Sequence, residues 1–398
     1  MEAWRAGLSG LSLPKGKYPS ASIIFLRLKR TGIMELRLHY GETPRWLFER
    51  MVRLGRGIVK VMASEFGRTE ILRRLSDPLF FQALSNTLGF DWDSSGSTTV
   101  TCGVLREVFN LEDVGIKMAG GKGEASKRTL EELDLLAEEL GISTWKTERL
   151  KYASRMTAKV DNAAIQAGYQ LYHHAFFLSE DGEWVVVQQG LNPEAKAARR
   201  YHWLSENVRS FVEEPHTGII GDKLHRRVLD LTAKESEEAR KTSVDLVADN
   251  PYRTVMPYLA SKPGQSSIAR WVSGQKVEGY TIIPVRVNWE ALKRACEFKP
   301  KNYEELLAVK GIGPSTVRGL ALVAELIYGS KVSWKDPLKF SFAFGGKDGV
   351  PFPVKRRAME RAAEYLRQAL EAAELGSREK LEALKRLRKF VPPDVEQC

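Results

Sequence analysis

The segment Asn302-Tyr-Glu-Glu-Leu-Leu-Ala-Val-Lys-Gly-Ile-Gly-Pro-Ser-Thr-Val-Arg-Gly-Leu-Ala-Leu-Val-Ala-Glu-Leu-Ile327 carries the clearest structural pattern in the chain. It predicts a short helix followed by a turn at Gly311 and Gly313, because glycine tolerates a positive φ. Pro314 suits the first position of a second helix, since its φ is already fixed and it has no amide to satisfy. Apolar residues then recur at helical spacing over 317–327. The segment therefore predicts a helical hairpin with a glycine turn.

This pattern resembles the helix-hairpin-helix, a module that binds DNA without sequence preference. The turn glycines have no Cβ, so a phosphate can approach the amide groups that open the second helix, where the helix dipole favours an anion. The alternative is an ordinary helical hairpin. The resemblance implies DNA contacts by Lys310, Gly311, Gly313, Ser315, Thr316 and Arg318.

The composition favours a polyanionic partner. The 398 residues carry a net charge of +11, and Lys and Arg release counterions when they bind phosphates. The three cysteines, Cys102, Cys296 and Cys398, are too scattered for a disulfide framework or a zinc knuckle, which favours the reducing cytoplasm. No apolar run is long enough to span a membrane. We therefore expect a cytoplasmic protein that binds single-stranded or structured DNA and no membrane.

The fold class predicted from these patterns is α+β and predominantly helical, with a mixed core, a central β-hairpin and a C-terminal helix-hairpin-helix region. The β-hairpin is predicted at 175–189, where apolar runs flank an Asp-Gly turn. Four regions follow from the motifs. They are an irregular leader (1–27), an N-terminal helical domain with a glycine-basic loop (28–150), an α+β catalytic domain (151–290), and the helix-hairpin-helix region with basic C-terminal helices (291–398).

Two further local predictions concern possible binding residues. Met118–Thr129 is a glycine-basic segment, so we expect a loop in which Lys122 contacts phosphate, with a flexible linker as the equal alternative. Thr129 and Glu132 have the spacing of a capping box that opens the next helix. Thr157–His174, interpreted as a helix, places four polar side chains on one stripe.

Residues 155–223 hold four of the six histidines together with several carboxylates, which is where we expect the chemistry. Such groups can hold a divalent cation that activates water and stabilises a phosphorane-like state. The simpler alternative is that these histidines are core or surface residues around the β-hairpin. We expect Mg²⁺ or Mn²⁺ to be bound by Asp161, Glu213, Glu214 and His216.

Other residues of this segment are assigned roles in proton transfer and phosphate binding. His174 or His202 is expected to act as a general acid or base near neutral pH. Arg199 and Arg200 lie among aromatic residues, which suits phosphate pairing and base stacking. The candidate catalytic residues are Lys159, Asp161, His173, His174, Gln189, His202, Glu213, Glu214 and His216.

Several strings together resemble one family. They are Leu38-His-Tyr-Gly41, Trp46-Leu-Phe48, Gly89-Phe-Asp-Trp-Asp-Ser-Ser-Gly96, Gly120-Gly-Lys-Gly123, Lys159-Val-Asp161, Tyr172-His-His174, Val187-Gln-Gln-Gly190, Arg199-Arg-Tyr-His202, Glu214-Pro-His216 and Gly345-Gly-Lys-Asp-Gly349. The chain is similar to domain-of-unknown-function family 763 of archaea and bacteria over nearly everything after residue 27. This resemblance implies no activity. Asp93 and Phe344 stand where many relatives are expected to have histidine, so neither position is an indispensable histidine ligand.

Three functions remain open. The first is a metal-dependent DNA nuclease of repair or recombination, which the mixture of histidine, carboxylate and cationic residues favours. The second is a DNA glycosylase, because Asp336 follows the hairpin glycines at about the spacing of the catalytic Asp in helix-hairpin-helix glycosylases. The third is a DNA-binding protein without catalysis. We expect the nuclease.

Overall fold

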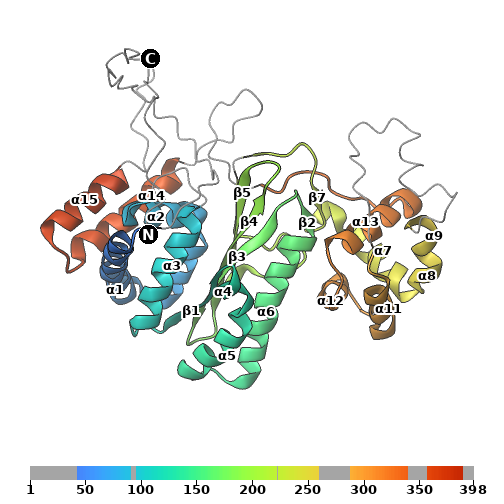
Figure 1. Cartoon of the computed structure of the whole chain (residues 1–398), viewed down its shortest axis with the longest axis horizontal. Coiled ribbons are helices and arrows are strands. Elements are labelled where there is room, and N and C mark those ends of the chain that lie inside the picture. Colours follow the sequence, from blue (N-terminus) through green and yellow to red (C-terminus); the bar gives the residue numbers. More distant parts are fainter. Residues whose placement is uncertain (1–42, 91–95, 222, 260–286, 339–355, 389–398) are drawn as a thin grey trace, which may run out of the picture. The chain divides into compact units, whose positions relative to one another are not determined.

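The computed structural model describes residues 43–90, 96–221, 223–259, 287–338 and 356–388 (Figure 1). The helices are α1 (Arg45–Ser76), α2 (Pro78–Leu88), α3 (Gly96–Leu111), α4 (Glu124–Lys127), α5 (Thr129–Glu139), α6 (Thr144–Ala163), η1 (Ser205–Asn207), η2 (Lys234–Ser236), α7 (Glu237–Ala248), α8 (Pro251–Thr254), α9 (Met256–Leu259), α11 (Trp289–Phe298), α12 (Tyr303–Ala308), α13 (Pro314–Tyr328), α14 (Arg356–Ala372) and α15 (Ser377–Arg388). The strands are β1 (Ile116–Lys122), β2 (Ile165–Gln166), β3 (Gln170–Ser179), β4 (Trp184–Asn192), β5 (Ala197–Leu204), β6 (Gly218–Gly221) and β7 (Leu229–Asp230).

Five strands form one antiparallel sheet in the order β1-β3-β4-β5-β6, and the short strands β2 and β7 pair separately. The predicted central β-hairpin is the β3–β4 pair. Helices make up most of the remaining described residues. The α+β, predominantly helical class is therefore confirmed. Among the described helices, none is long and apolar enough to cross a membrane.

Both faces of the sheet are buried, because successive side chains of a strand point to opposite faces. Phe177 and Val185 belong to a core formed with α1, α2, α3, α14 and α15. Phe176 and Val186 belong to a second core, formed with α5, α6, α7 and α11–α13. Figure 1 shows α1–α3 on one side of the sheet and α5 and α6 on the other. Polar side chains of the central strands are consequently enclosed on either face.

The predicted helical hairpin is present as α12 and α13, with Pro314 at the first turn of α13. Gly311 has a φ of 95°, which is the conformation that favours glycine. Helix α6 contacts the turn, because Lys159 Nζ donates a hydrogen bond to the Val309 carbonyl at 3.2 Å. The Gln166 amide donates to the Pro314 carbonyl at 2.8 Å. We call this unit the α12–α13 hairpin.

The predicted helix at Thr157–His174 is wrong beyond its first two turns. Helix α6 ends at Ala163, Gly168 takes a φ of 82°, and the chain then enters β3. Residues 170–179 pair with both β1 and β4, so the sheet hydrogen bonds outweigh the local helical pattern. His173 and His174 therefore lie on opposite faces of a strand instead of on a helical stripe.

The predicted glycine-basic loop is also wrong in its first half. Residues 116–122 form the edge strand β1, which pairs along its whole length with β3. The predicted capping box is absent, because the Thr129 hydroxyl donates to the Ser126 carbonyl at 2.8 Å. Glu132 instead accepts the Gly120 amide at 2.8 Å. Gly120 therefore permits a close approach of β1 to β3 and to the start of α5, where a Cβ would clash with the His174 carbonyl and the Thr129 hydroxyl.

Some sequence predictions lie outside the described residues. They are the leader 1–27, Asp93, and Phe344 with the glycines that follow it.

Candidate functional site

A buried polar cluster lies between α6 and the sheet, centred on Asp161. One carboxylate oxygen of Asp161 contacts Nε2 of His216, which follows β5 in the chain. The other accepts the side-chain amide of Gln188 and the indole N–H of Trp203, the latter at 3.0 Å. All four side chains are almost completely buried. Asp161 therefore fixes the orientation of the His216 imidazole, and Gln188 and Trp203 fix Asp161.

The same hydrogen-bond chain continues through Gln188 to a second histidine. His174 Nδ1 lies 2.7 Å from Gln188 Oε1, and its Nε2 lies 3.0 Å from the Ser154 hydroxyl. The Gln188 amide also donates to the Thr157 carbonyl at 3.0 Å. Burial lowers the pKa of His174, although Gln188 and Asp161 oppose this shift. His174 is thus a neutral, fully bonded link in the support of Asp161.

His216 connects this cluster to a pocket of about 290 Å³. We call Asp161 and His216 the dyad, and this cavity the dyad pocket. Burial raises the pKa of Asp230 in its wall, while the bond from the Thr232 hydroxyl lowers it. The residues lining the pocket are Glu214, His216, Ile219, Asp230, Thr232, Ala233, Lys234, Glu235, Ser333, Lys335, Asp336 and Pro337. An imidazole held by a buried carboxylate at the wall of a pocket is the arrangement of a general base.

A second buried polar row crosses the opposite face of the sheet. His173, Gln189 and Arg200 are cross-strand neighbours on β3, β4 and β5. Gln189 is bonded to the Thr98 hydroxyl of α3 and to the Tyr172 hydroxyl. We call His173, Gln189 and Arg200 the Arg200 row. It is separated from Asp161 by the sheet itself, so the predicted catalytic residues fall into two groups.

His202 lies on the same face as the Arg200 row. Its Nδ1 is 3.2 Å from the Leu75 carbonyl, and its ring packs edge-on against Phe81. Burial, with nearby Arg200, keeps the pKa of His202 well below its ordinary value. Burial likewise lowers the pKa of His173 to about 3. Both imidazoles are neutral in the folded protein, which does not suit the predicted acid–base role of His202.

Acidification is expected to destabilise the protein because His173, His174 and His202 all have lowered pKa values in the folded state. In the unfolded chain these histidines take up protons near pH 6.5, whereas in the folded protein they do not. The free energy of unfolding is therefore highest above pH 6.5 and decreases as the pH falls below it. For His173 this decrease continues down to about pH 3. Each histidine contributes a slope of about 1.4 kcal/mol per pH unit. Urea unfolding at pH 7.5, 6, 5 and 4.5 measures it.

His173→Gln is the matched variant for this measurement, because neither ring nitrogen of His173 has a hydrogen-bond partner among the described residues. The free energy of unfolding of this variant should decrease with falling pH less steeply than that of the wild type, by about 1.4 kcal/mol per pH unit. Equal slopes for the two proteins would contradict the assignment.

Strand β5 does not present its cationic residues to DNA. Arg199 is buried against Asp336, with 2.8 Å between Nη2 and Oδ2, and its guanidinium lies over the Tyr169 ring. Arg200 is buried on the other face. The alternation of residues that suggested phosphate contacts instead places successive side chains in two different cores. The burial of both guanidinium groups does not fit the predicted contacts of Arg199 and Arg200 with a DNA backbone lying on the protein surface.

The four predicted metal ligands are only partly brought together. Asp161 contacts His216, but Glu213 pairs with Arg240 at 2.8 Å and Glu214 is exposed at a φ of 42°. In the part of the chain that the structure describes, no group of three or more His, Cys, Asp or Glu side chains is arranged to hold a metal ion. These donors therefore do not fit a preformed centre, and the divalent metal stays a prediction.

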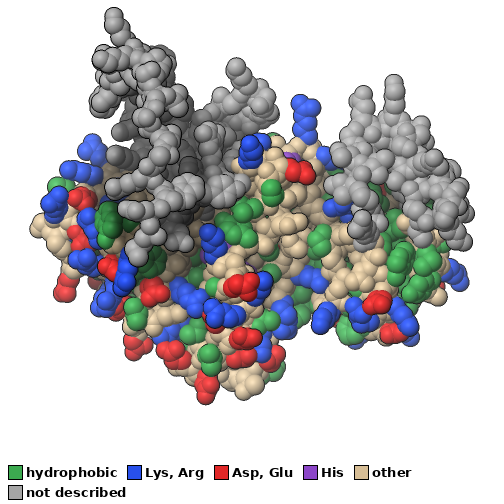
Figure 2. Space-filling view, in the orientation of Figure 1, with side chains coloured by type: hydrophobic (Ala, Val, Ile, Leu, Met, Phe, Trp, Pro, Cys, Tyr) green, Lys and Arg blue, Asp and Glu red, His purple; other side chains and the backbone are tan. Residues whose placement is uncertain are grey.

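The hairpin residues differ in their exposure. Lys310 is exposed beside the turn, and its carbonyl accepts Arg294 at 3.0 Å. Arg318 is half-buried and donates to Gln166, and the buried Thr316 hydroxyl accepts the Asn288 amide. Gly313 and Ser315 are partly exposed at the start of α13, and Gly311 and Lys122 are exposed. Figure 2 shows Lys and Arg interspersed with Asp and Glu on the face in view.

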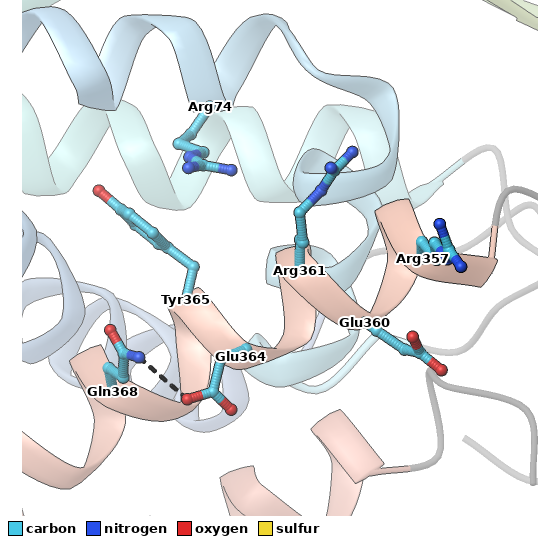
Figure 3. Close-up of a pocket in the computed structure, with 7 residues that line it drawn as sticks. All are labelled: Arg74, Arg357, Glu360, Arg361, Glu364, Tyr365 and Gln368. Atoms are coloured by element: carbon cyan, nitrogen blue, oxygen red, sulfur yellow. Dashed lines mark hydrogen bonds between the residues drawn. The ribbon is translucent and has the colours of Figure 1, made fainter.

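Another pocket, of about 520 Å³, lies between α1 and α14. Figure 3 shows Arg74 beside the Tyr365 ring, with Arg361 nearby on α14; the Arg74 guanidinium is 4.4 Å from the ring centre. Glu360 and Glu364 also line this pocket and offset the positive charge. The arginines Arg74, Arg357 and Arg361 still outnumber these two carboxylates, but none of the described lining residues is an imidazole held by a buried carboxylate, so the dyad pocket is the better candidate for a hydrolytic site.

Sequence reasoning missed two parts of the Asp161 cluster, Gln188 and Trp203. The available signal was the polar pair Gln188-Gln189 at the end of an apolar strand, because buried amides require partners. Alternation along the strand sends the first amide to Asp161 and the second to Thr98. Only the first of them belongs to the candidate site.

Comparisons with known proteins give a single result. No curated protein and no solved structure matches the chain. The family model described as "Protein of unknown function (DUF763)" matches residues 32–354, which is more than half of the 398 residues, so the chain belongs to this family.

Proposed function

We propose that the protein binds DNA through the α12–α13 hairpin and hydrolyses a phosphodiester bond at the dyad pocket. The observation that carries the proposal is the contact between buried Asp161 and His216, which lines that pocket. Helix α6 links the two functions, because it carries Asp161 and also supports the hairpin through Lys159. Substrate held at the hairpin is thereby coupled to the same rigid element as the base.

In the proposed reaction, His216 takes a proton from a water molecule as the water oxygen attacks phosphorus. The bond from phosphorus to the leaving oxygen then breaks, and that oxygen takes up a proton. Asp161 stabilises the imidazolium that forms. Lys335 in the pocket wall is paired with Glu235 at 2.8 Å, so Lys234 is the lysine proposed to supply positive charge toward the phosphate. The proposed substrate is single-stranded or structured DNA, and the proposed process is repair or recombination in the cytoplasm. The positive net charge supports a DNA substrate.

The contacts with DNA are proposed at the exposed part of the hairpin. Lys310 and the partly exposed Gly313 and Ser315 are placed where an anion meets the start of α13. A helical hairpin with a glycine turn also occurs without any ligand, so binding is tested directly. Lys310→Gln should weaken DNA binding for all sequences and lower the salt slope by about 1.

A denaturing gel tests the proposed activity. End-labelled single-stranded, duplex, forked and uracil-containing oligonucleotides are incubated with the protein in Mg²⁺, Mn²⁺ or EDTA, with and without alkali. Strand breaks without alkali support phosphodiester hydrolysis, and their dependence on added cation decides the metal prediction. Binding without any break would leave a DNA-binding protein and exclude the enzyme.

A glycosylase is the second candidate, since Asp336 also lines the dyad pocket. Its carboxylate is already paired with Arg199 and accepts the His225 amide at 2.9 Å. This pairing favours a structural carboxylate over one that attacks a sugar. Breaks that appear only after alkali, and that EDTA does not prevent, would support the glycosylase.

The turn itself provides a further test. A Cβ at Gly311 would lie 2.9 Å from Arg294 Nη2 and 3.0 Å from Ala291 Cβ, at a φ of 95°. Gly311→Ala should therefore cost about 1–2 kcal/mol of stability and weaken DNA binding. Gly376→Ala is the matched control, because nothing lies within 4 Å of a Cβ at Gly376 and this glycine lies outside the hairpin. Urea unfolding and fluorescence anisotropy measure both, and equal effects would contradict a specific role for the turn.

A further inference from the structure

The guanidinium of Arg200 is buried in the core, and no acidic side chain of the described residues contacts it. Its side chain is fully enclosed, and its Nε and Nη2 have no hydrogen-bond partner among the described residues. Among the described residues, its Nη1 reaches only neutral oxygens, Gln82 Oε1 at 3.3 Å and Thr98 Oγ1 at 3.4 Å. The Phe81 ring lies 4.7 Å from the guanidinium carbon. None of these contacts supplies a negative charge.

Other polar groups on the same side of the sheet also lack hydrogen-bond partners among the described residues. Within the described residues, the hydroxyls of Ser97 and Thr101 in the first turns of α3 have no partner. Neither ring nitrogen of His173 in the Arg200 row has one. The 16-residue helix α3 begins at Gly96, so its positive end lies next to the Thr98 hydroxyl that contacts Arg200. Arg200 contributes two N–H donors, and the Ser97 and Thr101 hydroxyls can each donate one hydrogen bond to an anion.

Such an arrangement is unfavourable unless an anion is present. Burying an unpaired charge is costly, and the nearby helix end adds positive potential to it. Burial lowers the pKa of Arg200 to about 9, so the guanidinium still carries its charge at neutral pH. The row also leads along the sheet from Arg200 through His173 to Lys122, which is exposed on the edge strand β1.

We propose that the Arg200 row and the start of α3 form a binding site for a phosphate group. Arg200 Nε and Nη2 offer the parallel pair of donors that binds two oxygens of one phosphate. Ser97, Thr101 and the first amides of α3 are the further donors for the remaining oxygens. The site lies on the opposite face of the sheet from His216, so it does not depend on the proposed nuclease activity.

Inorganic phosphate is the first probe, in isothermal titration calorimetry and thermal unfolding of the full chain at constant ionic strength. Saturable binding and a melting temperature raised by about 2–5 °C are expected, with no such rise in chloride. Adenosine monophosphate and a 5′-phosphorylated oligonucleotide are compared with their unphosphorylated forms. These arms distinguish free phosphate from a nucleotide or a DNA end as the natural source.

Arg200→Met and Ser97→Ala are the variants for this site. Arg200→Met removes the unpaired charge, so it should lose phosphate binding at least about 10-fold and be as stable as the wild type, or more stable, without phosphate. Ser97→Ala removes a hydroxyl that has no partner among the described residues, so it should fold normally and bind phosphate more weakly. Lys117→Met, a partly buried cation elsewhere on the sheet, should leave phosphate binding unchanged.

The competing source of negative charge is the chain itself, since Asp91 and Asp93 precede α3 in sequence and lie outside the described residues. If a carboxylate of the chain neutralises Arg200, then Arg200→Met will lower the melting temperature equally with and without phosphate. That result would overturn the proposal, as would a wild-type protein that phosphate neither binds nor stabilises.

Discussion

Asp161→Asn is expected to lower the rate of DNA cleavage by about 10²–10⁴-fold while leaving DNA binding within about twofold of the wild type. The carboxylate accepts three contacts, from His216, Gln188 and Trp203. An amide of the same shape cannot accept all of these donors and cannot stabilise a protonated His216. The loss should therefore appear in the chemical step, because the α12–α13 hairpin is untouched.

Single-turnover cleavage and fluorescence anisotropy measure the two quantities separately. Asp134→Asn is the matched control, since Asp134 is a surface carboxylate that pairs with Lys151. His216→Gln should resemble Asp161→Asn, and the double variant should be no worse than either single one, because the two residues act as a unit. Cleavage by Asp161→Asn at the wild-type rate, in a folded protein, would exclude the dyad as the catalytic base.

Asp336→Asn is expected to reduce the free energy of unfolding by about 3–5 kcal/mol. Asp336 and Arg199 are both almost completely buried and are 2.8 Å apart, so the substitution leaves an uncompensated guanidinium in the core. The same carboxylate also holds the amide of His225. This pair connects β5 to the segment that follows α13, so its loss should loosen that connection. Urea unfolding of the two proteins at pH 7.5 measures the difference.

The double variant Arg199→Met with Asp336→Leu distinguishes a structural role from a catalytic one. Removing both charges should restore much of the lost stability, since a buried ion pair contributes little over well-packed apolar groups. If Asp336 only supports the fold, strand cleavage should return together with stability. A double variant that is stable but inactive, with a glycosylase-type requirement for alkali in the wild type, would favour Asp336 as the reacting group.

Local patterns predicted those parts of the fold whose signals lie close together in the sequence. Pro314 and the glycine turn predicted the α12–α13 hairpin, and Asp181-Gly182 predicted the turn between β3 and β4. These patterns succeed because turn and helix-start preferences act over a few residues. The helix expected at Thr157–His174 failed because residues far away in sequence, those of β1 and β4, supply the hydrogen bonds that make β3 a strand.

The residues of the candidate site were also predicted only in part from the sequence. Residue types alone singled out Asp161 and His216, which the structure brings into contact across 55 positions of the chain. They also grouped His173, His202 and Arg200 with them, although these lie on the other face of the sheet. The sequence does not state which face a side chain occupies until the strand and its register are known, and a shift of one residue exchanges the faces.

The sequence by itself determined the α+β character, the central β-hairpin, the helical hairpin and the positive charge, because each depends on composition or on near neighbours. Only the tertiary structure decided that two helical layers cover the sheet and divide its polar residues into the Asp161 cluster and the Arg200 row. The physical reason is that the burial of both sheet faces arises only when the two helical layers pack against the sheet, and this packing joins residues that are far apart in the sequence. A polar side chain enclosed between the layers is stabilised by a partner in its own layer, as Asp161 is, or by a ligand, as we propose for Arg200.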